Sequence, residues 1–230
     1  MSSTGYYQFG DSEKKDAIDT NAALIFDRFD AFCRDKTKSY SPEKYVTKKS
    51  YLARQGNSMP NQIYLESLDP PDVVAIRDLF EESGLSNVFR SYFKSNFGVC
   101  NVRVWRYLPM TEEGDGYIRP HVDNFPPNAI KIMYYRGEVN AETSGCLELL
   151  NDQDEDFYRV TGSFPTVVFD SNNLRHQAMA PMGQSRDAIE ITVIPHIGSK
   201  PIFVDAGFQA GFPLNPLRRW DEPARFIKSM

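Results

Sequence analysis

Apolar and polar positions follow different periods in the two halves of the chain. Before residue 99, apolar residues recur at intervals of three and four, which is the spacing of one helical face. Residues 21–35 and 70–93 show this pattern, the second with a break at Gly84. Residues 1–16 are polar and carry no such period. We therefore expect a loose N-terminal segment followed by helices.

From residue 99 the pattern changes to short segments rich in Val, Ile, Tyr and Phe, separated by Gly, Pro, Asn and Asp. This texture is typical of strands in a sandwich or barrel. We expect strands at 99–107, 116–123, 130–136, 145–150, 165–170, 186–195 and 200–204. Helices followed by strands, without alternation, argue against a doubly wound parallel sheet. The sequence predicts a mainly β protein with N-terminal helices and a double-stranded β-helix core of the jelly-roll or cupin type.

The domain organisation that we predict has three parts within one structural domain. They are a helical flank at 1–98, the β-helix core at 99–204, and a C-terminal extension at 205–230 that packs on the core. A length of 230 residues suits one domain with a sizeable core.

Composition excludes several classes of partner. The net charge is −5 and no broad run of Lys or Arg occurs, so we expect no nucleic-acid partner. The three cysteines are far apart and form no C-x-x-C pair, which predicts neither a disulfide framework nor a zinc knuckle and favours a reducing cytoplasm. The N-terminus has no signal-peptide pattern and no apolar stretch could span a bilayer, so we expect no membrane association. The oligomeric state is left open.

Two of the three histidines stand in a pattern that indicates a metal site. Side chains at positions i and i+2 of a strand project to one face, so His121 and Asp123 on the strand 116–123 can bind one ion together. His176 on another strand would complete a set of two imidazoles and one carboxylate. That set leaves coordination positions open, as non-haem iron(II) oxygenases require. The remaining histidine, His196, follows a strand end and is interpreted as a structural or surface residue.

The His-x-Asp pattern alone also fits a surface strand with a satisfied histidine. Arg186 makes it more specific, because it lies 10 residues past His176 and opens the apolar segment 188–195. A planar guanidinium can bind a carboxylate through two parallel hydrogen bonds. The spacing therefore indicates a buried dicarboxylate co-substrate beside the metal.

Residues 99–197 resemble the catalytic core of the 2-oxoglutarate/iron(II) dioxygenases, in particular the prolyl 4-hydroxylase-like branch. The first 98 residues contribute nothing to the resemblance. The motifs that carry it are GYIRPHVDN at 116–124, IMYYRGEV at 132–139, SGCLELL at 144–150 and FPTVVFDSNNLRHQAMAPMGQSRDAIEITV at 164–193.

The resemblance implies Fe(II) bound by the two histidines and the aspartate, with 2-oxoglutarate and O2 as co-substrates. It further implies that Arg186 binds the far carboxylate of 2-oxoglutarate, with Tyr135 as its hydroxyl partner and Tyr107 lining the same pocket. Plain core packing remains the alternative for both tyrosines. Related halogenases carry a small residue at the position of Asp123, so the aspartate implies oxygen transfer or desaturation.

Strand parity adds two candidate substrate residues. If Arg186 points into the barrel, Glu190 shares its face, and if Tyr107 points inward, so does Arg103. A buried carboxylate needs a partner. Glu190 and Arg103 either pair with each other as a structural ion pair or bind a charged, amino-acid-like substrate.

The sequence thus predicts a dioxygenase that oxidises, and by default hydroxylates, a C–H bond of an amino-acid-like small molecule or natural product and releases succinate and CO2. Desaturation or ring formation would use the same residues. A prolyl hydroxylase acting on a peptide or protein is the first alternative. A zinc hydrolase would leave Arg186 without a role. A cupin-like metal-binding protein without turnover would need neither the guanidinium nor an open coordination position.

Overall fold

The computed structural model describes most of the predicted core and part of the N-terminal flank. The described residues are 5–10, 13–34, 62–64, 70–107, 109, 120–123, 128–150, 157–201 and 203. The predicted C-terminal extension at 205–230 and the first half of the predicted strand 116–123 lie outside them.

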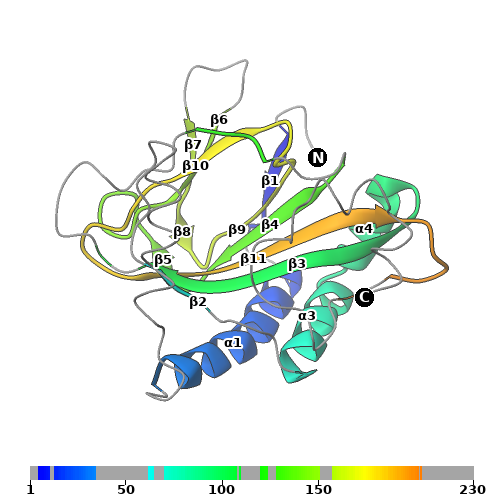
Figure 1. Cartoon of the computed structure of the whole chain (residues 1–230), viewed down its shortest axis with the longest axis horizontal. Helices are drawn as coiled ribbons and strands as arrows, with labels where there is room; N and C mark the ends of the chain where they lie inside the picture. The colour runs from blue at the N-terminus through cyan, green and yellow to red at the C-terminus, as the bar shows by residue number, and fades with distance from the viewer. Residues whose placement is uncertain are drawn as a thin grey trace.

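The described elements are mainly strands, preceded by helices (Figure 1). The helices are α1 (Glu13–Arg34), α3 (Pro70–Glu82) and α4 (Leu85–Phe93). The strands are β1 (Tyr6–Gln8), β2 (Gln62–Tyr64), β3 (Asn96–Tyr107), β4 (Ile130–Tyr135), β5 (Glu138–Val139), β6 (Leu147–Leu150), β7 (Phe157–Val160), β8 (Gly162–Ser163), β9 (Thr166–Phe169), β10 (Arg175–Ala178) and β11 (Arg186–His196).

Two antiparallel sheets form the core. The main sheet has six strands in the order β1-β9-β4-β11-β3-β2, and the smaller sheet has the order β10-β6-β7. Figure 1 shows α1 and α3 against one face of the main sheet and the smaller sheet on the other side. The prediction of a mainly β protein with N-terminal helices and a double-stranded β-helix core is confirmed.

The main sheet has an outer face toward the helices and an inner face toward the smaller sheet. Side chains of β11 alternate between them, so that Ile189 and Ile191 join the outer apolar cluster while Ala188 joins the inner one. The outer cluster includes Ile18, Phe26, Phe29, Ile76, Phe80, Phe89, Val102, Val104, Ile132, Ile189, Ile191 and Val193. Each such side chain contributes roughly 1.5–3 kcal/mol by leaving water, so this cluster fixes the helices on the sheet.

An ion-pair network on the outer face fixes the orientation of β11. Arg106 binds Asp187 through two contacts of 2.7 and 2.8 Å and reaches Asp30 on α1 at 2.9 Å. Arg136 binds the other oxygen of Asp30 at 2.7 Å. Because neighbouring side chains of a strand point to opposite faces, Asp187 on the outer face places Arg186 on the inner face.

Two expectations about the elements are wrong, and the range of one strand was missed. The described part of the segment 1–16 is not loose, because β1 pairs with β9 as the edge strand of the main sheet and α1 begins at Glu13. No strand occurs at 200–204 among the described residues there, which are 200, 201 and 203. The range of β10 was absent from the expected strands, because its sequence RHQA shows no apolar alternation, although His176 itself was expected on a strand. The division of the chain at residues 98 and 204 stays a prediction, although β1 and β2 from the flank pair within the main sheet.

Gly145 is required where the chain enters β6. Its φ is +64°, and a Cβ built there would lie 2.4 Å from the carbonyl oxygen of Met179. We expect Gly145→Ala to lower the free energy of unfolding by more than about 3 kcal/mol, since a left-handed alanine costs roughly 1–2 kcal/mol and overpacking about 1–3 kcal/mol. Gly137→Ala is the matched control, because φ is +75° there but no atom lies within 4 Å of the added Cβ. Denaturant titration of both variants checks this, and equal losses would contradict it.

Candidate metal centre

Two neighbouring segments carry the candidate metal ligands. His121 forms an isolated antiparallel bridge with His176 of β10, through backbone hydrogen bonds of 3.0 and 2.8 Å. The backbone N–H of Asp123 donates to the carbonyl of Ser171 at 2.7 Å. Residues 120–123 therefore run beside the smaller sheet, but they form this single bridge in place of the predicted regular strand.

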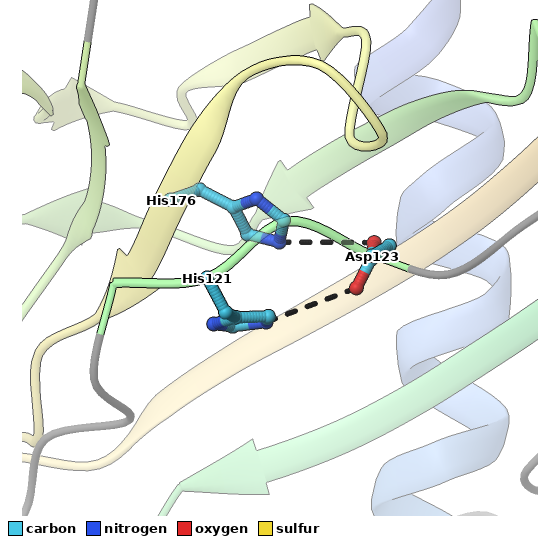
Figure 2. Close-up of side chains that lie close together, drawn as sticks. All are labelled: His121, Asp123 and His176. Carbon is cyan, nitrogen blue, oxygen red and sulfur yellow. Dashed lines mark ion pairs between the residues drawn. The ribbon is translucent and has the colours of Figure 1, made fainter. Parts of the chain in front are cut away.

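The three side chains point toward one another (Figure 2). His121 Nε2 lies 3.7 Å from Oδ1 of Asp123, and His176 Nε2 lies 3.7 Å from Oδ2. One ligand atom from each residue falls within 4.8 Å of the others. Donors that each bind an ion at about 2.1 Å lie up to roughly 4 Å apart, so small closing movements of these side chains would complete a metal site. The side chain of His121 is 39% exposed and that of His176 is 5% exposed, which leaves one side of the site open.

Protonation states at the site also suit a metal. Burial lowers the pKa of His176 to about 4, and the positive charge of Lys131 adds to the shift. Its Nδ1 lies 3.1 Å from the carbonyl of Leu174, which assigns the proton to Nδ1 and the lone pair to Nε2. Burial alone would raise the pKa of Asp123, but Lys131 and His176 lower it to about 2. At neutral pH the site offers a neutral imidazole and an ionised carboxylate.

Arg186 lies on the inner face as a buried charge. It is 2% exposed, and its Nη2 donates to the carbonyl of Met179 at 3.0 Å. Within the described part of the chain, its Nε and Nη1 have no hydrogen-bond partner. Its guanidinium carbon lies 4.8 Å from the ring centroid of Tyr107 and 5.3 Å from that of Tyr135. A guanidinium buried among aromatic rings with two donor groups open needs an anion.

Tyr107 and Tyr135 share this place with Arg186, as the resemblance implied. Burial raises the pKa of Tyr107 to about 12 and raises that of Tyr135 further above its usual value. Both phenols therefore stay protonated and can donate hydrogen bonds to an anion held by the guanidinium.

Glu190 is held in a cluster of charges that the sequence showed only in part. Its carboxylate lies 3.5 Å from Nη1 of Arg103, so the two residues do pair. The structure adds Lys131, whose Nζ lies 3.4 Å from the other carboxylate oxygen, and Asn101, whose amide nitrogen lies at 3.4 Å. Among the described residues, Oδ1 of Asn101 and Oγ1 of Thr192 are buried without a hydrogen-bond partner. We call these five residues the polar cluster.

Strand register separates this cluster from Arg186. Arg186 stands opposite Tyr107, whereas Glu190 stands opposite Arg103 and Met133 on the neighbouring strands. Four residues along a strand correspond to about 13 Å. The inner face thus has an anion-binding end at Arg186 and a charged, polar end at the cluster. His196, at the far end of β11, lies outside both.

No helix in the described parts of the chain is both long and apolar enough to cross a membrane.

Comparisons with known proteins show the fold. No family model matches the chain, and no curated protein matches it in sequence. A prolyl-4-hydroxylase of Pseudomonas putida is similar in structure, with a TM-score of 0.52 and 16% identity over 84% of this chain and 94% of that chain. The non-heme alpha-ketoglutarate-dependent epimerase SnoN from nogalamycin biosynthesis has a TM-score of 0.55 and 13% identity over 94% of this chain and 89% of that chain. The chain therefore has the fold of these enzymes.

Proposed function

We propose that the chain is a non-haem iron(II) oxygenase that uses 2-oxoglutarate and O2 as co-substrates. The observation that supports this most is Arg186, a buried guanidinium with two open donor groups on the sheet face that also adjoins a His-Asp-His set. A buried charge of this kind destabilises the ligand-free protein, so it is best explained by an anion that binds there. The fold shared with an alpha-ketoglutarate-dependent epimerase supports the same reading.

Each part of the site has a role in this proposal. His121, Asp123 and His176 hold Fe(II) and leave positions for other ligands. When bound, the iron supplies the oxygen activation that oxidation of a C–H bond requires. Arg186 binds the far carboxylate of 2-oxoglutarate, and its planar fork fixes the direction of the keto acid.

The two tyrosines complete the co-substrate pocket in the proposal. The hydroxyl of Tyr135 donates to the same carboxylate, and the ring of Tyr107 covers the guanidinium from a second side. Together they exclude water from the ion pair, which strengthens it.

The substrate that we propose is an amino-acid-like small molecule or natural product, hydroxylated at a C–H bond. The polar cluster supports this, because it offers a carboxylate, two cations and two open polar atoms on the same inner face. Such a set can bind both charges of a zwitterion. Hydroxylation of a prolyl peptide is the second candidate, since a prolyl-4-hydroxylase shares the fold.

Consumption of 2-oxoglutarate by the purified protein tests the proposal. With Fe(II) and O2 we expect succinate to form, faster when a substrate is present, and we expect zinc not to replace iron. Free amino acids and short proline-containing peptides, added separately, distinguish the two candidate substrate classes. A zinc hydrolase or a metal-binding protein without turnover would release no succinate in any of these mixtures.

Glu190→Gln tests the substrate role of the polar cluster. We expect the variant to bind an amino-acid substrate more weakly by about 2–5 kcal/mol, the usual effect of removing one partner from a buried charge pair. Slow consumption of 2-oxoglutarate without substrate should persist, because the metal ligands, Arg186 and the ion pair of Lys131 with Asp123 are retained. The readout is the KM for substrate beside the rate of succinate release.

Glu148→Gln is the matched control for that variant. Glu148 is also a buried carboxylate, and it accepts hydrogen bonds from Gln177 and Arg159. Gln177 neighbours His176 in β10 and so points away from the metal centre. Equal changes in substrate KM in the two variants would show that Glu190 acts through stability alone.

A further inference from the structure

Lys131 is a buried cation that touches a candidate metal ligand. Its side chain is 7% exposed, and its Nζ lies 2.5 Å from Oδ2 of Asp123. On its other side, Nζ lies 3.4 Å from Glu190. The ammonium is therefore held between two carboxylates that come from different segments of the chain.

Packing alone does not account for a lysine at this position. On the inner face, Met133 lies two residues along β4 and Phe169 stands opposite in β9, while Thr192 stands opposite in β11. The ammonium lies 6.0 Å from the centroid of Phe169. Replacing buried ion pairs with apolar side chains is often neutral or stabilising, so an ion pair in this place suggests a function.

The contact divides the carboxylate of Asp123 into two unlike oxygens. Oδ2 is fully buried, faces the ammonium and lies 3.7 Å from Nε2 of His176, while Oδ1 lies 3.7 Å from Nε2 of His121 and has no further cation beside it among the described residues. Lys131 meets Oδ2 as a close ion pair. A metal that approached Oδ2 would have to displace a positive charge, whereas the same metal meets no such charge at Oδ1.

We propose that Lys131 is a positioning residue that occupies Oδ2 of Asp123, so that a bound metal receives one oxygen from this carboxylate. The inference rests on the proposed function, because it concerns the metal of that site. Two histidines and one carboxylate oxygen fill three positions of an octahedral ion. If both oxygens of Asp123 bound, one position fewer would remain for the keto acid and oxygen.

Glu190 fixes the ammonium from the far side in this arrangement. The chain of contacts runs from Asp123 through Lys131 and Glu190 to Arg103 and joins the segment 120–123 to β4, β11 and β3. Partners of ligating carboxylates tune metal sites in general. The polar cluster would thus serve the metal as well as the substrate.

Manganese binding tests the proposal without any turnover. Mn(II) prefers the same kinds of ligand as Fe(II) and is stable in air, and water-proton relaxation gives the number of exchangeable waters on it. We expect Lys131→Met to hold one metal-bound water fewer than the unaltered protein. We also expect it to bind Mn(II) at least about threefold more tightly, because a neighbouring positive charge has been removed. In the Mn(II)-loaded variant, 2-oxoglutarate should bind at least about tenfold more weakly, at the low end of the usual loss for an altered outer-shell partner.

Three further variants make the result specific. Lys131→Gln removes the charge but keeps a polar side chain, and it should behave like Lys131→Met if the latter folds poorly. Lys131→Arg keeps the charge and should keep the full number of waters. Lys200→Met removes an exposed lysine and controls for the change in net charge.

The outcomes separate this inference from the proposed function. An unchanged number of metal-bound waters, or weaker Mn(II) binding, in both uncharged variants would overturn the role of Lys131. Absence of succinate from the unaltered protein would overturn the proposed function. The manganese comparison would still measure the effect of Lys131 on the number of metal-bound waters and on Mn(II) affinity.

Discussion

His176→Ala should abolish metal binding and 2-oxoglutarate consumption together. The imidazole is 5% exposed at its side chain and already carries its lone pair on Nε2, so alanine removes a prepared ligand that water could replace only poorly. Losing an outer-shell partner of a metal typically lowers affinity or activity 10–100-fold, so the loss of a direct ligand should exceed about 100-fold. His121→Ala and Asp123→Ala should act in the same way.

Thermal unfolding gives a readout of metal binding that does not depend on turnover. A metal that binds only the folded state raises the melting temperature by mass action. Mn(II) should therefore stabilise the unaltered protein and leave His176→Ala unchanged. His196→Ala is the matched control, since His196 is a buried histidine at the far end of β11. Retention of full activity by any one of the three ligand variants would remove that residue from the site.

The sequence predicted the helices and strands that pack one apolar face against the core, because such a face leaves a regular spacing of apolar residues. α3 and α4 lie within the predicted helical segment 70–93 and are separated at Gly84, whose φ is +75°. β3, β4, β9 and β11 fall within or close to their predicted ranges, because each packs an apolar outer side against the helices.

Elements with no apolar alternation could not be predicted in the same way. β10 reads RHQA, and its position follows from pairing with β6, which is a contact between segments far apart in the chain. β1 is a three-residue strand that is held by β9. Such strands are set by their partners, and single-sequence periodicity contains no information about partners.

The candidate site likewise contains residues that sequence spacing indicates and one residue, Lys131, that depends on a contact between distant segments. His-x-Asp, the distal histidine and the arginine stand at spacings that a sequence displays, and strand parity placed Arg103 and Glu190 on one face, where they lie 3.5 Å apart. Lys131 was missed because its segment was interpreted only as a strand, and a lone lysine in a strand commonly faces solvent. Its contact with Asp123 joins two segments that the sequence does not place side by side, and only the three-dimensional structure shows it.

Arg186→Met should weaken the binding of 2-oxoglutarate without lowering the stability of the ligand-free protein. In the ligand-free protein the guanidinium is buried with two donor groups open, so an apolar side chain of similar length should leave the free energy of unfolding unchanged or raise it. The same change should remove the partner of the far carboxylate and weaken 2-oxoglutarate binding by about 2–5 kcal/mol. Mn(II) should still bind, because the metal ligands are untouched.

Arg186→Lys distinguishes the geometry of the guanidinium from its charge. An ammonium offers a point charge where the guanidinium offers a planar fork, so we expect the KM for 2-oxoglutarate to rise at least about tenfold, or roughly 1.4 kcal/mol. Arg106→Lys is the matched control, because Arg106 forks onto Asp187 on the outer face of the same sheet. That variant should lose stability and keep its KM for 2-oxoglutarate.

If Arg186→Met instead unfolded more easily and still bound 2-oxoglutarate normally, the guanidinium would be a structural group held by Met179 and its two tyrosines, and another cation would have to bind the keto acid.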